Sequence, residues 1–325
     1  MEKTKTRSKE PRLKIGKYNV SRIRESLELY VLLALPVVFL FIMAYAPMPG
    51  IAVAFQNFKL GQKGFFGDHV KWVGLKHFKD FVEGKYFGRL MGNTLRISLK
   101  SLLFDFPIPI IFALLLNEVK HLRTKKFIQT ASYLPHFIST VVVAGMVVNF
   151  VERDGLVTTL LTKLFNAPNQ NWLSVADSFD TVYVATIVWI GFGFNSILYM
   201  SAISGVDQEL YEAARLDGAT RWQQCWYITL PGILPTVSIM LIMALGSILG
   251  TSTDLILNLY NTGIFEKADC IGTYVYRMGL GIEGATGLPK YSATSAIGLF
   301  TSIINITMLF IANKLSNWLT DTGLW

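Results

Sequence analysis

Long apolar segments separated by short polar ones occupy most of this chain. Six of them have about 20 residues, the length that an α-helix needs to cross the hydrocarbon core of a bilayer. They cover residues 29–46, 98–116, 127–150, 182–200, 232–257 and 293–312. The second is the least regular, because it contains Lys100, Asp105 and two prolines, and the third contains Pro135. Neighbouring helices can satisfy the backbone groups that a proline frees, so the pattern predicts an all-α integral membrane protein with six transmembrane helices.

Composition supports this fold class. Hydrophobic residues make up 52% of the 325 residues, charged residues make up 16%, and the mean hydropathy is +0.42. Soluble domains are typically less apolar and carry more charge. The expected parts are a basic N-terminal segment (1–28), a first transmembrane helix (29–46), an outer loop (47–92), a core domain (93–312) and a C-terminal tail (313–325).

The distribution of basic residues predicts the orientation of the chain. Nine Lys and Arg residues lie within residues 1–28, and four more lie within residues 120–126, after the second apolar segment. Cytoplasmic loops carry such an excess, so we expect both termini to be cytoplasmic. The outer loop 47–92 also holds seven basic residues, but long loops contribute less to this rule.

The basic N-terminus has two alternative interpretations. An arm that binds nucleic acid would need a folded partner domain, and a solvated tail near anionic lipid is the simpler account. A signal peptide would have a shorter basic region, and Pro47 follows the possible cleavage site at residues 44–46. We therefore expect an uncleaved first helix, preceded by an amphipathic helix over residues 20–28 that lies along the inner membrane surface.

A polar segment lies between the fourth and fifth apolar segments. Asp207 is placed to cap a helix over residues 208–217, and Gly218 follows it as the residue that allows a left-handed turn. A second short helix is expected over residues 219–227, and Pro231 suits the first turn of the long helix that follows. These residues predict a helix–turn–helix on one side of the membrane.

The same segment resembles the EAA loop of ABC importer permeases. Glu-Ala-Ala at 212–214 is followed four residues later by Gly218, and after nine more residues by Ile-x-Leu-Pro at 228–231. The resemblance extends over residues 90–312 and implies a type I importer permease whose loop, residues 207–231, docks onto a cytoplasmic ATPase. The candidate coupling residues are Glu212, Ala213, Ala214, Leu216, Asp217 and Gly218. The alternative is an ordinary amphipathic connector.

A second stretch is similar to the third transmembrane segment of carbohydrate permeases. It covers residues 133–145 and is followed by Asp-Gly-Leu-Val at 154–157. Within that group it is most similar to the LplB-like branch, which serves complex oligosaccharides such as those from pectin or alginate. Residues 72–78, ahead of Asn-Thr-Leu at 93–95, resemble the outer-loop element of these sugar permeases.

The resemblance implies a permease subunit in the bacterial cell membrane. Its expected partners are a second, related permease, a cytoplasmic ABC ATPase dimer and an extracytoplasmic solute-binding protein that delivers an oligosaccharide. The chain lacks the G-x-x-x-x-G-K-[ST] motif, so ATP and Mg²⁺ are expected on the ATPase and no cofactor on this chain. The four histidines have no metal-ligand spacing, and no nucleic-acid partner or catalytic residue is expected.

A sugar pathway needs polar and aromatic side chains at mid-membrane, where unused polar groups are costly. In maltose-type permeases the sugar contacts lie on the helices before and after the EAA loop. The matching positions here are Ile187, Trp189, Gly191, Phe194 and Ser247 or its neighbour, and the same segments add Asn195 and Thr251 as polar candidates. We favour Trp189, although it lies about 120° around an ideal helix from Asn195, so the two can line one wide cavity or face different neighbours. The alternative is that these residues only pack helices together.

Other functions remain open at this stage. An ion-coupled secondary carrier needs carboxylates at mid-depth, and Asp105 is the only acidic residue well inside an apolar segment. An ABC permease for a substrate other than sugar would share the EAA-like loop. A dinucleotide site is disfavoured, because the Gly-x-Gly-x-x-Gly at 279–284 follows no predicted strand.

Overall fold

The computed structural model describes residues 27–59, 61–62, 64–67, 70–282, 287–320 and 322–324. The basic segment up to residue 26, with most of the expected surface helix, lies outside the described residues, as does the end of the glycine-rich stretch at 283–284. The chain divides into two units, Met1–Ala52 and Val53–Trp325.

The first unit contains α2 (Leu27–Leu40), which continues into a π-helical turn, Phe41–Tyr45. Its residues are apolar almost throughout, and Pro36 lies inside the helix, where a membrane helix tolerates it. A 3-10 helix, Met48–Phe55, follows and crosses into the second unit. The 27 residues Leu29–Phe55 are long and apolar enough to cross a membrane, and they include the predicted first transmembrane helix, residues 29–46.

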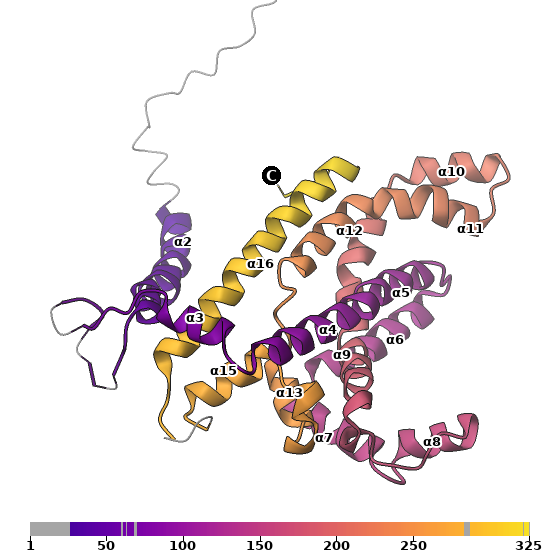
Figure 1. Ribbon diagram of the computed structural model, residues 1–325. Helices are drawn as coiled ribbons and strands as arrows, with labels where there is room; N and C mark the ends of the chain where they lie inside the picture. The colour runs from indigo at the N-terminus through magenta and orange to yellow at the C-terminus, as the bar shows by residue number, and fades with distance from the viewer. Residues whose placement is uncertain are drawn as a thin grey trace, which may run out of the picture. The chain divides into compact units, whose positions relative to one another are not determined.

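The second unit is built of helices (Figure 1), and its described residues form no strand beyond an isolated bridge between Gln56 and Trp72. The helices are α3 (Lys76–Val82), α4 (Phe87–Asp105), α5 (Pro107–Asn117), α6 (Leu122–Tyr133), α7 (Thr140–Val151), α8 (Leu156–Phe165), α9 (Phe179–Ser204), α10 (Gln208–Leu216), α11 (Arg221–Gln224), α12 (Leu230–Leu245), α13 (Thr253–Leu259), α14 (Phe265–Ala268), α15 (Ile271–Gly279) and α16 (Tyr291–Thr320).

Helix α9 lies at the centre of this unit and packs against α4, α5, α6 and α12. At one end its buried residues Phe179 and Tyr183 join Ile256 of α13 in an apolar core, and at the other end Tyr199 joins Ile233 of α12 in a second core. The α10–α11 hairpin lies at one end of the long helices, and α13 and α15 lie at the other (Figure 1). Polar structures therefore occur at both ends of an apolar bundle.

Within the described residues, five helices are long and apolar enough to cross a membrane, and a bent pair makes six if it counts as one span. Besides the segment in the first unit, they are Phe87–Asn117, Ala176–Ser204, Arg221–Leu245 and Tyr291–Trp318. The predicted all-α membrane fold is confirmed. The second span begins earlier than predicted, at Phe87, and Pro107 begins α5 within it, where a missing N–H is tolerated.

The third predicted span, residues 127–150, is not one continuous helix. Helices Leu122–Phe137 and Thr140–Phe165 meet at a bend of 100°. Pro135 lies in a 3-10 turn at the end of the first helix, and Ser139 begins the next one, where its side chain accepts a hydrogen bond from the Val142 N–H. A proline followed at this distance by an N-cap residue ends one helix and starts another.

The fifth predicted span, residues 232–257, is not one helix either. α12 ends at Leu245, residues 246–252 are not helical, and α13 begins at Thr253. The short helix expected over residues 219–227 is instead the start of this span, because α11 runs through a π-helical turn, Cys225–Thr229, directly into α12.

Candidate functional site

The geometry of the α10–α11 hairpin follows from local hydrogen bonds. The Asp207 side chain accepts a bond of 3.0 Å from the Glu209 N–H at the start of α10. Gly218 has φ +79° after the end of the helix, as predicted from its position. Thr220 and Gln223 then form a capping box that starts α11. The turn is therefore specified by a glycine and two caps that are adjacent in sequence.

Two longer contacts fix this hairpin on the bundle. Tyr211 is only 8% exposed, and its hydroxyl lies 2.9 Å from the Thr229 hydroxyl at the end of the π-helical turn. Arg221 forms an ion pair of 3.3 Å with Glu118, which follows α5. These contacts connect α10 to the helical segment that leads into α12, and α11 to the end of α5.

The outer face of the hairpin is exposed. Leu216 is 90% exposed, and Glu212 and Ala213 of the Glu-Ala-Ala motif are exposed beside it, while Ala214 is half-buried. Further apolar side chains with large exposed fractions are Leu210, Trp222, Trp226 and Tyr227. An apolar surface rimmed by charge is typical of a protein contact.

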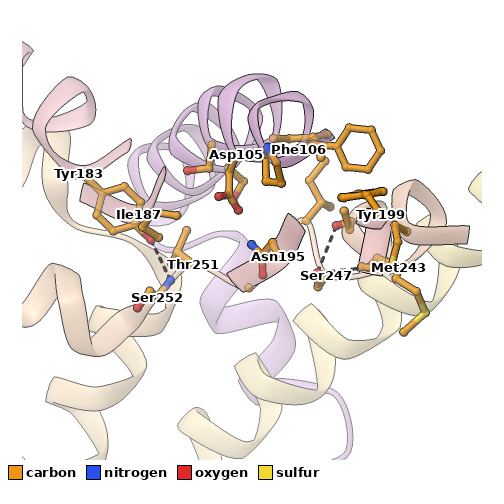
Figure 2. Close-up of a pocket in the computed structure, with 18 residues that line it drawn as sticks. Asp105, Phe106, Tyr183, Ile187, Asn195, Tyr199, Met243, Ser247, Thr251 and Ser252 are labelled. Atoms are coloured by element: carbon orange, nitrogen blue, oxygen red, sulfur yellow. Dashed lines mark hydrogen bonds between the residues drawn. The ribbon is translucent and has the colours of Figure 1, made fainter. Parts of the chain in front are cut away.

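A cavity of about 630 Å³ lies between α4, α5, α9 and α12 (Figure 2). Four of the seven predicted pathway residues line it, namely Ile187, Asn195, Ser247 and Thr251. Other polar side chains in its wall include Asp105, Tyr183 and Tyr199. The site therefore combines helices that are far apart in the sequence, and it offers hydroxyl, amide and carboxylate groups inside an apolar bundle.

The non-helical segment 246–252 forms one wall of this cavity. Side chains from two other helices satisfy its backbone: the Ser252 N–H donates to the Tyr183 hydroxyl at 2.9 Å, and the Leu249 N–H donates to the Asn305 side chain at 3.1 Å. At membrane depth, irregular backbone is tolerated where it is buried in protein or lines a cavity. The interruption of span five thus exposes Thr251 in the wall of the pocket.

Asp105 is a cavity residue that the sequence analysis did not include among the pathway residues. It is the only charged residue in the cavity wall among the described residues, and its Oδ1 is buried without a hydrogen-bonding partner. Gly191 lies next to it: a Cβ there would be 3.4 Å from Asp105 Oδ1 and 3.0 Å from Asn195 Nδ2. The sequence contained one sign of this role for Asp105, namely a carboxylate inside an apolar segment. The sequence analysis had considered that carboxylate only as evidence for an ion-coupled carrier.

Comparison with known proteins identifies the family. Residues 105–321 match the family of binding-protein-dependent transport system inner membrane components. The chain belongs to this family. It is 39% identical to protein LplB of Bacillus subtilis (strain 168) over 298 residues, and this alignment covers 91% of each protein. It is 35% identical to the polygalacturonan/rhamnogalacturonan transport system permease protein YteP of the same strain, with 91% of this chain and 90% of YteP covered.

A solved structure has the same fold. In the crystal structure of a bacterial ABC transporter involved in the import of the acidic polysaccharide alginate, one chain matches with a TM-score of 0.78 and 37% sequence identity. The match covers 93% of this chain and 99% of that one. The prediction of an ABC importer permease is therefore confirmed, and the protein is a multi-pass membrane subunit of a transport family rather than of a catalytic one.

The permease does not bring Trp189 and Phe194 into the cavity beside Asp105. Trp189 lines a second, mostly apolar cavity of about 670 Å³ together with residues of α7 and α8. Phe194 stacks on His136, with ring centroids 3.8 Å apart and an interplanar angle of 5°. Both side chains leave α9 on faces that pack against the bent third span, which is a role the sequence analysis had kept as the alternative.

Two buried carboxylates near one end of the permease core bind basic side chains. Asp180 of α9 accepts bonds of 2.7 Å from Arg96 and 2.8 Å from Lys100, both on α4. Asp269 forms a bidentate pair with Arg277, at 2.8 and 2.9 Å. Charges inside a membrane protein are usually paired in this way, so Lys100 does not disrupt the second span but ties α4 to α9.

Proposed function

We propose that this permease forms half of the pathway for an oligosaccharide in an ATP-driven importer, and that the loop 207–231 couples it to the ATPase. The observation that carries this proposal is the connection between two sites. The α10–α11 hairpin presents its Glu-Ala-Ala motif outward while Tyr211 and Arg221 tie it to the helices that surround the polar cavity. A partner that moves the hairpin can therefore change the shape of the cavity.

The coupling residues have separate roles in this proposal. The exposed side chains of Glu212 and Leu216 supply a charged and an apolar contact to a cytoplasmic ATPase. Ala213 and Ala214 allow a close approach because they are small, and Asp217 and Gly218 form the turn. ATP and Mg²⁺ bind to the ATPase, so this subunit itself needs no cofactor and carries no hydrolytic site.

The substrate is inferred from the relatives and from the cavity. YteP is named for polygalacturonan and rhamnogalacturonan, and AraP of Bacillus subtilis, 27% identical to this chain, is named for arabinooligosaccharides. Hydroxyl and amide groups such as those of Tyr199, Asn195 and Thr251 can bond to sugar hydroxyls. A cavity of about 630 Å³ is within the ordinary size range of ligand pockets.

The partners follow from the family. The cavity wall in this subunit is completed by a second, related permease, and an extracytoplasmic solute-binding protein delivers the sugar. The related alginate transporter has been crystallised in complex with a periplasmic protein bound to an alginate pentasaccharide.

In this arrangement the hairpin and both termini face the cytoplasm. A cysteine placed at Gly64 should react with an impermeant reagent in intact cells, whereas cysteines at Lys125 and Gln223 should not, and labelling of Gln223 would contradict this topology.

The deciding experiment reconstitutes the complete importer with wild-type or Glu212→Ala permease and measures uptake of labelled oligosaccharides. We expect uptake that requires ATP and the binding protein, and a Glu212→Ala complex that assembles but loses most of its sugar-stimulated ATPase activity. Glu209→Ala, a change at an exposed residue on the same helix outside the motif, is the matched control. Uptake driven by an ion gradient without ATP would instead show a secondary carrier, and ATP-driven uptake of only non-sugar solutes would show another class of ABC permease.

A further inference from the structure

We propose that Asp105 makes this cavity select sugars by charge, so that neutral or amine-bearing oligosaccharides enter it and oligosaccharides with carboxylate groups are disfavoured. This inference rests on the proposed function and assigns its substrate class. YteP and the alginate importer are named for acidic polysaccharides, so the inferred preference differs from the substrates in those names.

The first argument is the charge of the cavity wall. Asp105 is the only charged residue among the described residues that line it, and no Lys, Arg or His side chain accompanies it. The basic residues earlier on the same helix are already bound, since Arg96 and Lys100 both donate to Asp180. Among the described residues of this subunit, the Asp105 carboxylate therefore has no cation beside it in the cavity wall.

The second argument is that Asp105 has no structural task within the described part of the subunit. Its Oδ1 is buried without a hydrogen-bonding partner, and no ion pair to a basic side chain of the described residues involves it. Asp180, by contrast, has two cationic partners. A carboxylate inside a membrane is costly and typically marks a substrate or ion pathway. Asp105 Oδ2 is not among the buried atoms, so it is the oxygen that a ligand in the cavity would reach.

The third argument is the arrangement around Asp105. Asn195 projects toward the same region of the cavity (Figure 2), and Gly191 between them has no side chain that would fill the space. A carboxylate accepts hydrogen bonds and an amide both donates and accepts them, which suits sugar hydroxyls or an ammonium group. A sugar carboxylate has no proton to donate to Asp105 at neutral pH and would face a like charge.

The expected discrimination can be estimated from Coulomb's law. Two like unit charges about 6 Å apart at an effective dielectric constant of about 20 disfavour occupancy by about a hundredfold. Water in the cavity and counterions reduce this effect, so we expect a measured preference of at least about tenfold for a neutral over a carboxylate-bearing trisaccharide.

The test uses the complete permease–ATPase complex in detergent, without the binding protein, whose own specificity would otherwise dominate. Ligand-observed NMR titration would give the affinities for galactotriose, trigalacturonate and chitosan trisaccharide, which differ in charge but have similar size. The wild type should bind the first and third at least about tenfold more tightly than trigalacturonate. In Asp105→Asn this preference should fall to about twofold or less, and Asp105→Glu, which keeps the charge, should retain it.

Ser101→Ala is the matched control, because Ser101 lines the same cavity on the same helix without a charge. It should leave the preference unchanged. A wild-type complex that binds trigalacturonate as tightly as galactotriose would overturn the inference even if no Asp105 variant can be purified. So would an Asp105→Asn complex with the wild-type preference. A complex that neither binds nor imports any oligosaccharide would contradict the proposed function itself, whereas sugar import without charge preference contradicts only this inference.

Discussion

The residues that shape the α10–α11 hairpin lie close together in the sequence, whereas those that shape the cavity beside Asp105 come from distant parts of the chain. Asp207, Gly218 and Thr220 set the shape of the hairpin through hydrogen bonds to residues a few positions away. The cavity takes walls from α4, α9, α12 and the segment 246–252, and its irregular wall is held by Tyr183 and Asn305 from two other helices. We therefore expect one substitution to be able to disable the hairpin, and the cavity to tolerate most single changes and to respond mainly to changes of charge.

The strongest test of this comparison is Gly218→Val. A β-branched residue resists the left-handed backbone at φ +79°, so the hairpin should lose its turn. We expect ATP-driven uptake below about a tenth of wild type, since such strain costs about 1–3 kcal/mol, with sugar binding to the cavity unchanged.

The control for Gly218→Val is Gly64→Val, a change at a glycine that also has φ +79° and no atom within 4 Å of an added Cβ. It imposes the same backbone strain outside the hairpin and should leave uptake near wild type. Uptake by Gly218→Val at the wild-type rate would show that the hairpin shape is not needed for coupling.

A smaller effect is expected from Asp180→Asn, which tests whether the cavity walls are held from a distance. It leaves Arg96 and Lys100 facing a neutral amide. Breaking a buried pair costs about 3–5 kcal/mol, and because the two basic side chains are 30% and 46% exposed, we expect about 2 kcal/mol. The melting temperature of the purified complex should fall by several degrees.

Asp177→Asn provides the contrast for that measurement. Asp177 is 84% exposed and lies 3.4 Å from Lys267, so its loss should change stability by less than about 0.5 kcal/mol. Equal melting temperatures for the two variants would mean that the Asp180 cluster does not hold α4 against α9.

The smallest expected effects come from substitutions on two different faces of α9, at Asn195 and at Trp189. Asn195→Ala removes one cavity hydrogen-bonding group and should raise the sugar concentration for half-maximal uptake by about two- to fivefold, the equivalent of one hydrogen bond, without loss of stability. Trp189→Ala should instead lower the stability of the complex by about 2 kcal/mol, because Trp189 packs in the apolar cavity near α7 and α8. It should leave the sugar concentration for half-maximal uptake unchanged. A selective loss of sugar affinity in Trp189→Ala would restore Trp189 as the main sugar contact.

Sequence alone was sufficient for the features that depend on local chemistry. The apolar segments have the length that a bilayer requires, so the all-α membrane fold and the approximate place of the spans could be predicted. In the hairpin, the cap at Asp207 and the left-handed Gly218 were predicted, because capping and turn preferences act over a few residues. The EAA-like spacing also gave the family before any comparison.

The tertiary structure decided the rest. The unwound segment 246–252 depends on side chains from two other helices, which an apolar run does not reveal. Trp189 and Asn195 belong to different cavities because α9 is covered on several sides. Lys100 and Asp105 are both charges within one apolar segment, but within the described part of the chain only Lys100 meets an opposite charge, since Asp180 lies 80 residues away in sequence and beside it in space. Pairing of that kind is a property of packed helices, and it left Asp105 free to face the cavity.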